Sequence, residues 1–187
     1  MLSAPSTEIT ADIRERASRI KLVCFDVDGT LTDGRLHYDS DGRESKDFHV
    51  LDGQGMVLLK RFGIPAAFIT ARNSASAAHR ATDLGLQAFI GCKDKLAQVR
   101  ALCEAQGIGL DEVAFMGDDL PDLEVMLAVG LSVAPANAHR WIAERAAWIT
   151  TAKGGKGAAR ELCDLLLETQ GHVATLLAGS KPAGSAR

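Results

Sequence analysis

Short apolar runs alternate with longer segments in which apolar residues recur every three or four positions along most of the chain. The runs predict strands buried on both faces, at 21–26, 66–70, 88–90, 113–116, 131–134 and 148–150. The periodic segments predict helices, at 11–18, 52–62, 74–84, 94–106, 120–129, 138–145 and 157–170. This alternation indicates an α/β fold: a Rossmann-like, doubly wound, mostly parallel sheet with helices on both faces.

Residues 35–50 depart from this pattern. Leu36 and Tyr38 alternate with polar residues before a strong turn signal at 39–42, and the alternation resumes around Phe48. A period of two on both sides of a turn predicts a β-hairpin, inserted after the first strand. Because an isolated hairpin is only marginally stable in water, we expect it to pack against the main body or against another subunit.

The chain of 187 residues is long enough for one domain with a sizeable core. We expect that single domain over residues 11–171. The polar segment 1–10 is expected to be disordered, and residues 172–187, which end in a Gly/Ser/Pro-rich stretch, are expected to form a flexible tail.

Composition and charge exclude several classes of protein. The net charge of −3, with mixed signs, gives no support for non-specific binding to nucleic acid. No apolar run reaches the roughly 18–20 residues of a membrane span, and residues 1–10 lack the apolar core of a signal peptide. The four cysteines form no C-x-x-C pair, which favours free thiols over a zinc site. We therefore expect a cytoplasmic protein without nucleic-acid or membrane partners.

Two carboxylates, Asp26 and Asp28, stand where the first strand should end, followed by Gly29, which permits a sharp turn. Residues two apart in extended chain project to one side, so both carboxylates face one small volume. They repel each other unless a cation relieves them, and Mg²⁺ prefers such oxygen ligands. A carboxylate can also attack phosphorus. We predict Asp26 as nucleophile and metal ligand and Asp28 as general acid and base; the alternative is an acidic Asx-type turn.

Polar residues also follow the other predicted strands. Thr70 ends the strand 66–70, Lys95 lies at a helix N-terminus, and Asp118 follows the strand 113–116. In open parallel sheets the site lies beyond the carboxyl ends of the strands. The Thr70 hydroxyl and the Lys95 ammonium can hold a phosphoryl group. Asp118 can complete a Mg²⁺ site with Asp26 and the backbone carbonyl of Asp28.

Two further carboxylates, Asp119 and Asp122, could hold waters or orient Lys95 from behind the metal site.

The polar residues at the strand ends each have a simpler interpretation. Thr70 could cap a helix, Lys95 could be a solvated surface lysine, and 118–122 could be an acidic helix start. The features nevertheless occur in order at successive strand ends, which favours the phosphoryl-transfer interpretation.

The motif Asp-x-Asp-x-Thr at 26–30, together with Thr70, Lys95 and the acidic stretch 117–122, resembles the haloacid dehalogenase-like phosphatases over residues 11–171. The resemblance implies Mg²⁺-dependent hydrolysis through an aspartyl-phosphate. Many of these enzymes carry a cap domain. Here the hairpin fills the stretch after the first strand, and only one helix and one strand fit between Thr70 and Lys95, so we expect a capless enzyme.

Four segments, 27–34, 52–55, 69–72 and 154–157, more narrowly resemble the 3-deoxy-D-manno-octulosonate (KDO) 8-phosphate phosphatases of lipopolysaccharide biosynthesis. That resemblance implies a homotetramer acting on KDO 8-phosphate. The residues it places at the substrate are Asp28, His49, Asp52, Gly53, Arg72, Arg80 and Lys95. Close relatives act on acidic nine-carbon sugar phosphates, such as those of sialic acid or KDN. Ala71 and Leu51 depart from the usual glycine and basic residue.

The residues themselves agree with an acidic sugar phosphate, which has a phosphate and a carboxylate. Arginine suits bidentate recognition of carboxylates. Arg72 and Arg80 lie about 12 Å apart along a helix, so they cannot both hold the transferring phosphate. One of the two therefore serves a neighbouring subunit's site or is only solvated, and for Arg80 both its own site and a neighbouring subunit's site stay open.

A capless site excludes water poorly unless a neighbouring subunit closes it. We therefore expect a homo-oligomer with sites shared between subunits, and we expect the segment 154–157 and the tail to help close them. The rival hypotheses are a capless phosphatase for a macromolecule, favoured by a monomer with an exposed site, and a non-catalytic scaffold. The intact pair Asp26 and Asp28 argues against the scaffold.

Overall fold

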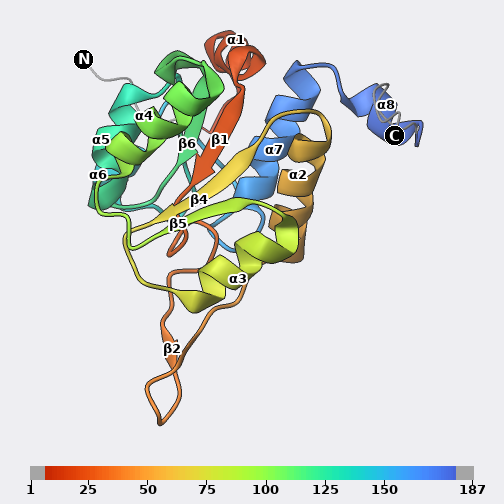
Figure 1. The fold of residues 1–187 in the computed structure, drawn as a ribbon. Coiled ribbons are helices and arrows are strands. Elements are labelled where there is room, and N and C mark those ends of the chain that lie inside the picture. Colours follow the sequence, from red (N-terminus) through yellow and green to blue (C-terminus); the bar gives the residue numbers. More distant parts are fainter. Residues whose placement is uncertain (1–6, 180–187) are drawn as a thin grey trace.

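The computed structural model describes residues 7–179. A six-stranded sheet, parallel throughout, has the strand order β5-β4-β1-β6-β7-β8 (Figure 1). Its strands are β1 Leu22–Phe25, β4 Ala66–Thr70, β5 Gln87–Ile90, β6 Val113–Met116, β7 Leu131–Ala134 and β8 Trp148–Ile149. The predicted α/β fold is confirmed, and β1 takes a central place with β4 and β6 beside it.

Helices cover both faces of the sheet because alternate strand residues point to opposite sides. Val23 and Phe25 of β1 belong to the core under one group of helices, and Leu22 and Cys24 to the core under the other. The first group is α1 Ala11–Arg19, α2 Val50–Arg61, α3 Ala75–Leu84 and α7 Ala158–Thr169. The second is α4 Lys95–Gln106, α5 Leu123–Ala128 and α6 Arg140–Ala143 (Figure 1).

Local signals fix where most helices begin and end. The Ser74 hydroxyl accepts a hydrogen bond from the Ala77 backbone N–H at 3.3 Å, as predicted for an N-cap. The prediction of one continuous α-helix over 120–129 is wrong for its first turn, which is not α-helical. A short 3₁₀ helix, η2 Leu120–Asp122, precedes α5, because the Asp122 carboxylate turns back onto backbone N–H groups before it. A second 3₁₀ turn, η1 Leu110–Glu112, leads into β6.

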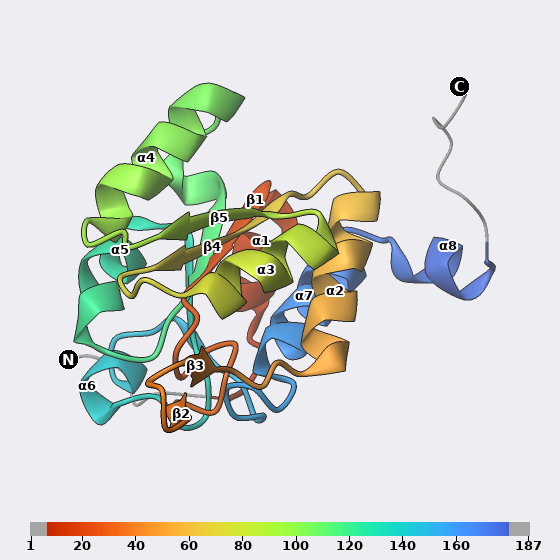
Figure 2. The same cartoon turned by 60° about the horizontal axis from the view of Figure 1, so that its bottom comes forward.

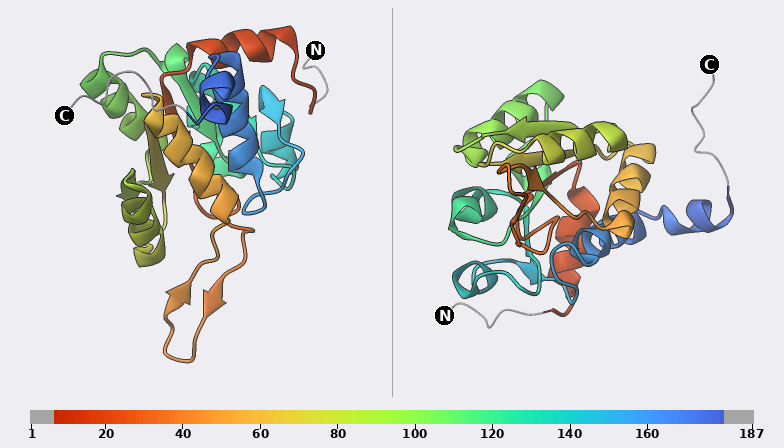
Figure 3. Two further views of the ribbon diagram at one scale, coloured as in Figure 1. Left: turned by 90° about the vertical axis from the view of Figure 1, so that its right-hand side faces the viewer. Right: turned by 90° about the horizontal axis from the view of Figure 1, so that it is seen from below.

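The predicted hairpin is present but its strands are short: β2 His37–Tyr38 and β3 Glu44–Ser45. The Asp39 carboxylate closes its tip by accepting from the backbone N–H groups of Asp41 and Arg43. Figure 1 and the left view of Figure 3 show the hairpin projecting below the body, and Figure 2 shows β2 and β3 with this end turned toward the viewer. The second arm ends earlier than predicted, because Val50 begins α2.

The two expected terminal segments lie partly outside the described residues, at 1–6 and 180–187. The described parts contain structure. The Thr7 carbonyl accepts a hydrogen bond from the Trp148 indole at 3.2 Å, and Ile9 packs against the core. A helix, α8 Val173–Leu177, follows α7 and projects to one side of the body (Figure 1), and its Leu176 packs against the core. None of the helices in residues 7–179 combines the length and the apolar composition of a membrane span.

Candidate active site

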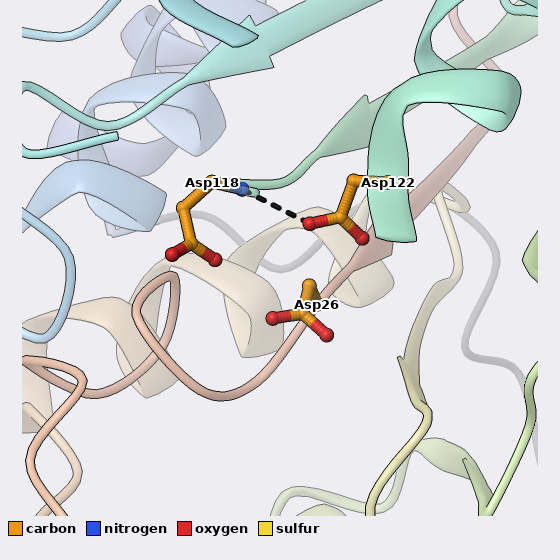
Figure 4. A group of neighbouring side chains, drawn as sticks. All are labelled: Asp26, Asp118 and Asp122. Carbon is orange, nitrogen blue, oxygen red and sulfur yellow. Dashed lines mark hydrogen bonds between the residues drawn. The ribbon is translucent and has the colours of Figure 1, made fainter. Parts of the chain in front are cut away.

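Three carboxylates meet beyond the ends of β1 and β6; we call Asp26, Asp118 and Asp122 the acidic cluster. Asp26 follows β1 directly, Asp118 lies two residues after β6, and Asp122 ends η2. One oxygen of each lies within 4.8 Å of the others (Figure 4). The adjacency of β1 and β6 in the sheet explains why residues so far apart in sequence meet.

Lys95 lies inside this cluster and is almost fully buried. Its ammonium donates to Asp26 Oδ1 and, at 2.6 Å, to Asp122 Oδ1. The Asp94 carboxylate caps α4 by accepting from the Ala97 backbone N–H, which places Lys95 at the first helical position. Burial acts to lower the pKa of Lys95, but Asp26 and Asp122 outweigh it and raise that pKa. The interpretation as a solvated surface lysine is therefore wrong.

The two remaining acidic residues of the motif have different places. Both Asp122 oxygens are engaged by protein donors, Oδ1 by Lys95 and Oδ2 by the backbone N–H groups of Asp118 (3.0 Å) and Asp119 (3.4 Å). Asp122 therefore contacts Lys95 directly and is placed to orient it. The exposed Asp119 carboxylate instead caps η2 by accepting from the Leu120 backbone N–H at 2.8 Å. It does not contact Lys95.

Free oxygen atoms point to where a cation would bind. Among residues 7–179, Asp26 Oδ2, Asp118 Oδ2 and the backbone carbonyl of Asp28 accept no hydrogen bond, whereas Asp118 Oδ1 accepts from Thr30 at 3.2 Å. Burial and the nearby Asp122 raise the pKa of Asp26 to about 8 and that of Asp118 to about 7. A divalent cation would relieve this crowding of negative charge, so the residues predicted as ligands fit Mg²⁺.

Thr70 ends β4 beside β1 and is buried. Its hydroxyl accepts from the Arg72 backbone N–H at 3.2 Å, so it turns the chain after the strand. Ser74, not Thr70, caps the following helix, which removes the simpler interpretation of Thr70.

A second group, the hairpin cluster, consists of Asp28, Tyr38, Glu44, Lys46 and Arg72. The buried Lys46 ammonium donates to Asp28 Oδ1 and, at 2.6 Å, to Glu44 Oε1. Arg72 donates to Tyr38 Oη at 3.0 Å and to Glu44 Oε1 at 3.1 Å. The hairpin thereby reaches both the predicted acid/base and the predicted substrate arginine.

Sequence reasoning missed Glu44 and Lys46. A signal was available in the hairpin itself. Tyr38 and Glu44 are directly opposite in the β2–β3 register, and Lys46 lies two residues beyond Glu44. Residues two apart in extended chain project to one side, so the hairpin pattern could have placed Glu44 and Lys46 together.

The remaining predicted substrate residues form a separate group. His49, Asp52, Gly53 and Arg80 line a small pocket between α2 and α3. The buried Asp52 accepts from the backbone N–H groups of Arg160 (2.8 Å) and Gly157 (3.4 Å), so it caps α7. The structure brings these four residues together but gives them no hydrogen bond to the acidic cluster within residues 7–179.

The glycine-rich segment 154–157 supports the loop that follows β1. The Gly155 N–H donates to the Thr30 carbonyl at 3.1 Å, and the Gly154 N–H donates to Asn137 Oδ1 at 2.6 Å. A Cβ at Gly154 would overlap the backbone carbonyl of Gly29. The loop bearing Asp28 therefore depends on close backbone contact with a segment more than a hundred residues later.

Gly154→Ala is expected to lower the free energy of unfolding by about 3 kcal/mol, because two backbones must separate and no side-chain rotamer can relieve the overlap. Urea denaturation measures this. Gly171→Ala is the control, since Gly171 has a positive φ but open space around it; it should cost only about 1 kcal/mol. Equal losses in the two variants would contradict the role given to Gly154.

Comparisons with known proteins agree with this geometry. The sequence profile of the haloacid dehalogenase-like hydrolases matches residues 91–162. The 3-deoxy-D-manno-octulosonate 8-phosphate phosphatase of Escherichia coli K12 is 42% identical over 166 residues, 88% of each chain. A hypothetical protein of Xanthomonas campestris has a crystal structure with 59% identity and a TM-score of 0.91, covering 96% of this chain and 98% of that one.

The Moraxella catarrhalis 3-deoxy-D-manno-octulosonate 8-phosphate phosphatase was crystallised with magnesium, phosphate and KDO. It shares 40% identity and a TM-score of 0.87, covering 90% of this chain and 97% of its own. Identity at this level over nearly the whole chain, together with the buried acidic cluster and Lys95, establishes the relationship. The chain belongs to the haloacid dehalogenase-like phosphatases, in the same family as the 3-deoxy-D-manno-octulosonate 8-phosphate phosphatases.

Proposed function

We propose that this enzyme hydrolyses KDO 8-phosphate to KDO and inorganic phosphate in the cytoplasm, as a step of lipopolysaccharide precursor synthesis that depends on Mg²⁺. The observation that carries the proposal is the position of Arg72 beside Asp28. The Arg72 Nε lies 3.6 Å from Asp28 Oδ2, at the end of the sheet where the acidic cluster also lies. A site with a nucleophile and a nearby arginine suits a sugar with both a phosphate and a carboxylate. The relatives' names agree with KDO 8-phosphate as the substrate. The four free cysteines agree with the proposed cytoplasmic location.

In the proposed mechanism an Asp26 oxygen attacks phosphorus as the bond from phosphorus to the sugar oxygen breaks, and Asp28, which enters this step protonated, gives its proton to that oxygen. Asp28 then takes a proton from the water that hydrolyses the aspartyl-phosphate. Asp26, Asp118 and the Asp28 backbone carbonyl would hold Mg²⁺. When bound, the ion would neutralise the charge on the phosphoryl oxygens. Lys95 favours the ionised form of Asp26 by donating to it, and the Thr70 hydroxyl lies at the adjacent strand end to hold the phosphoryl group.

We further propose a homotetramer in which neighbouring subunits complete each site. Four large apolar side chains on the hairpin and at the start of α2 are exposed: Leu36, Tyr38, Val50 and Leu51. A second copy could cover this apolar surface and close the capless site. The pocket of His49 and Arg80 would then contribute to substrate binding from its place between α2 and α3.

The test is a panel of phosphate esters with Mg²⁺. We expect kcat/KM for KDO 8-phosphate to exceed that for glucose 6-phosphate by at least about a hundredfold, because a neutral sugar leaves Arg72 without its carboxylate. Sialic acid 9-phosphate tests the neighbouring acidic substrate class. A preference for glucose 6-phosphate, or no hydrolysis of either acidic sugar phosphate, would overturn the proposal.

A further inference from the structure

Arg72, the arginine proposed to bind the substrate carboxylate, already has a carboxylate partner in the hairpin. Its Nη2 donates both to Tyr38 Oη (3.0 Å) and to Glu44 Oε1 (3.1 Å). Its Nε is buried without a hydrogen-bond partner, and it faces Asp28 Oδ2, which is also buried without one. One edge of the guanidinium is thus occupied by the protein's own residues.

Glu44 has a second cationic partner that would remain if Arg72 left. The Lys46 ammonium lies 2.6 Å from Glu44 Oε1 and its side chain is only 1% exposed. Burial opposes ionisation of Glu44, but Lys46 and Arg72 outweigh it and lower the pKa of Glu44. When Asp28 is ionised, two cations, Lys46 and Arg72, balance two anions, Asp28 and Glu44, so the hairpin cluster then carries no net charge. An incoming carboxylate can therefore exchange with Glu44 at Arg72 while Glu44 stays paired with Lys46.

We propose that Glu44 acts as an internal competitor for the sugar carboxylate, occupying at Arg72 the place that the carboxylate of substrate and product takes. The proposal rests on the proposed function, in which the substrate is an acidic sugar phosphate. Free KDO keeps the carboxylate after its phosphate is removed. Glu44 therefore weakens retention of the product as well as binding of the substrate. This competition makes Glu44 a specificity-determining residue of the hairpin.

Glu44→Gln tests this, because the amide keeps the shape of the side chain and loses its charge. We expect the Ki for free KDO as a product inhibitor to fall about threefold to tenfold. The reason is that the partly exposed ion pair between Arg72 and Glu44 no longer competes with the KDO carboxylate. The Ki for inorganic phosphate should stay unchanged, since phosphate alone does not carry the sugar carboxylate. Asp41→Asn is the control, because Asp41 pairs with Arg43 at the exposed hairpin tip; it should change neither Ki.

The double variant Glu44→Gln with Arg72→Gln asks whether the effect passes through Arg72. We expect Arg72→Gln to weaken inhibition by KDO, and Glu44→Gln to produce no further change in that background. An unchanged or higher Ki for KDO in Glu44→Gln, with a wild-type enzyme that hydrolyses KDO 8-phosphate, would overturn this proposal alone. A wild-type enzyme that neither hydrolyses KDO 8-phosphate nor binds KDO would overturn the proposed function, and this inference with it.

Discussion

Asp26→Asn is expected to lose at least about a thousandfold of kcat toward KDO 8-phosphate while keeping its fold. The amide has the size of the carboxylate, but it is a poor nucleophile toward phosphorus. Asp26 is 6% exposed and lies against Lys95, so the substitution leaves the packing intact and removes only the reactive oxygen. Steady-state kinetics with Mg²⁺ measures the loss, and circular dichroism with a thermal melt confirms the fold.

Asp83→Asn serves as the matched control for this loss. Asp83 lies on α3, is half exposed, and pairs with His79 at 3.9 Å. Its substitution should leave kcat unchanged. An Asp26→Asn enzyme with wild-type turnover would contradict the nucleophilic role, whereas an unfolded one would show that the carboxylate is needed for the fold.

Lys95→Met is expected to affect both activity and stability. The ammonium balances two buried carboxylates, Asp26 and Asp122, so its removal leaves uncompensated charge in the interior. The free energy of unfolding should fall by about 3 kcal/mol without metal. Loss of a charged group at the phosphoryl site should lower kcat/KM by about a hundredfold to a thousandfold. Urea denaturation and steady-state kinetics measure the two effects.

Magnesium separates the charge effect of Lys95 from a packing effect. Because Mg²⁺ would supply the missing positive charge, it should stabilise Lys95→Met more than it stabilises the wild-type protein. Lys60→Met is the control, since the Lys60 ammonium donates to the Gly85 carbonyl at the surface. Lys60→Met should match the wild type in stability and kinetics. A Lys95→Met protein that also matches it would show that the buried ion pairs contribute nothing measurable.

The position of the acidic cluster was predictable because parallel strands bring their carboxyl ends to one edge. Asp26, Thr70 and Asp118 each follow an apolar run, and apolar runs are the clearest local signal in this chain. The order of the strands carries no such local signal. It is set by packing between distant segments, and it decides that Asp26 meets Asp118 across adjacent strands.

The hairpin cluster was harder to predict because its members are polar residues on short strands. Glu44 and Lys46 look like a solvated surface pair in sequence, yet Lys46 is buried by its contacts with Asp28. Asp52 has a structural contact that its local sequence does not signal. Its substrate role stays a prediction from the resemblance, whereas its hydrogen bonds to the start of α7 could not be predicted because they join residues more than a hundred positions apart.

Direct observation of phosphorylated Asp26 tests the central claim, a covalent aspartyl-phosphate. The Asp28→Asn variant is suited to it, because the amide keeps the backbone carbonyl but cannot activate water. With p-nitrophenyl phosphate the leaving group needs no proton, so the first step proceeds and the second slows. After rapid acid quench, peptide mass spectrometry should find one phosphoryl group on the peptide containing Asp26. Release of free phosphate without a phosphorylated peptide, or phosphorylation of another residue, would contradict the mechanism.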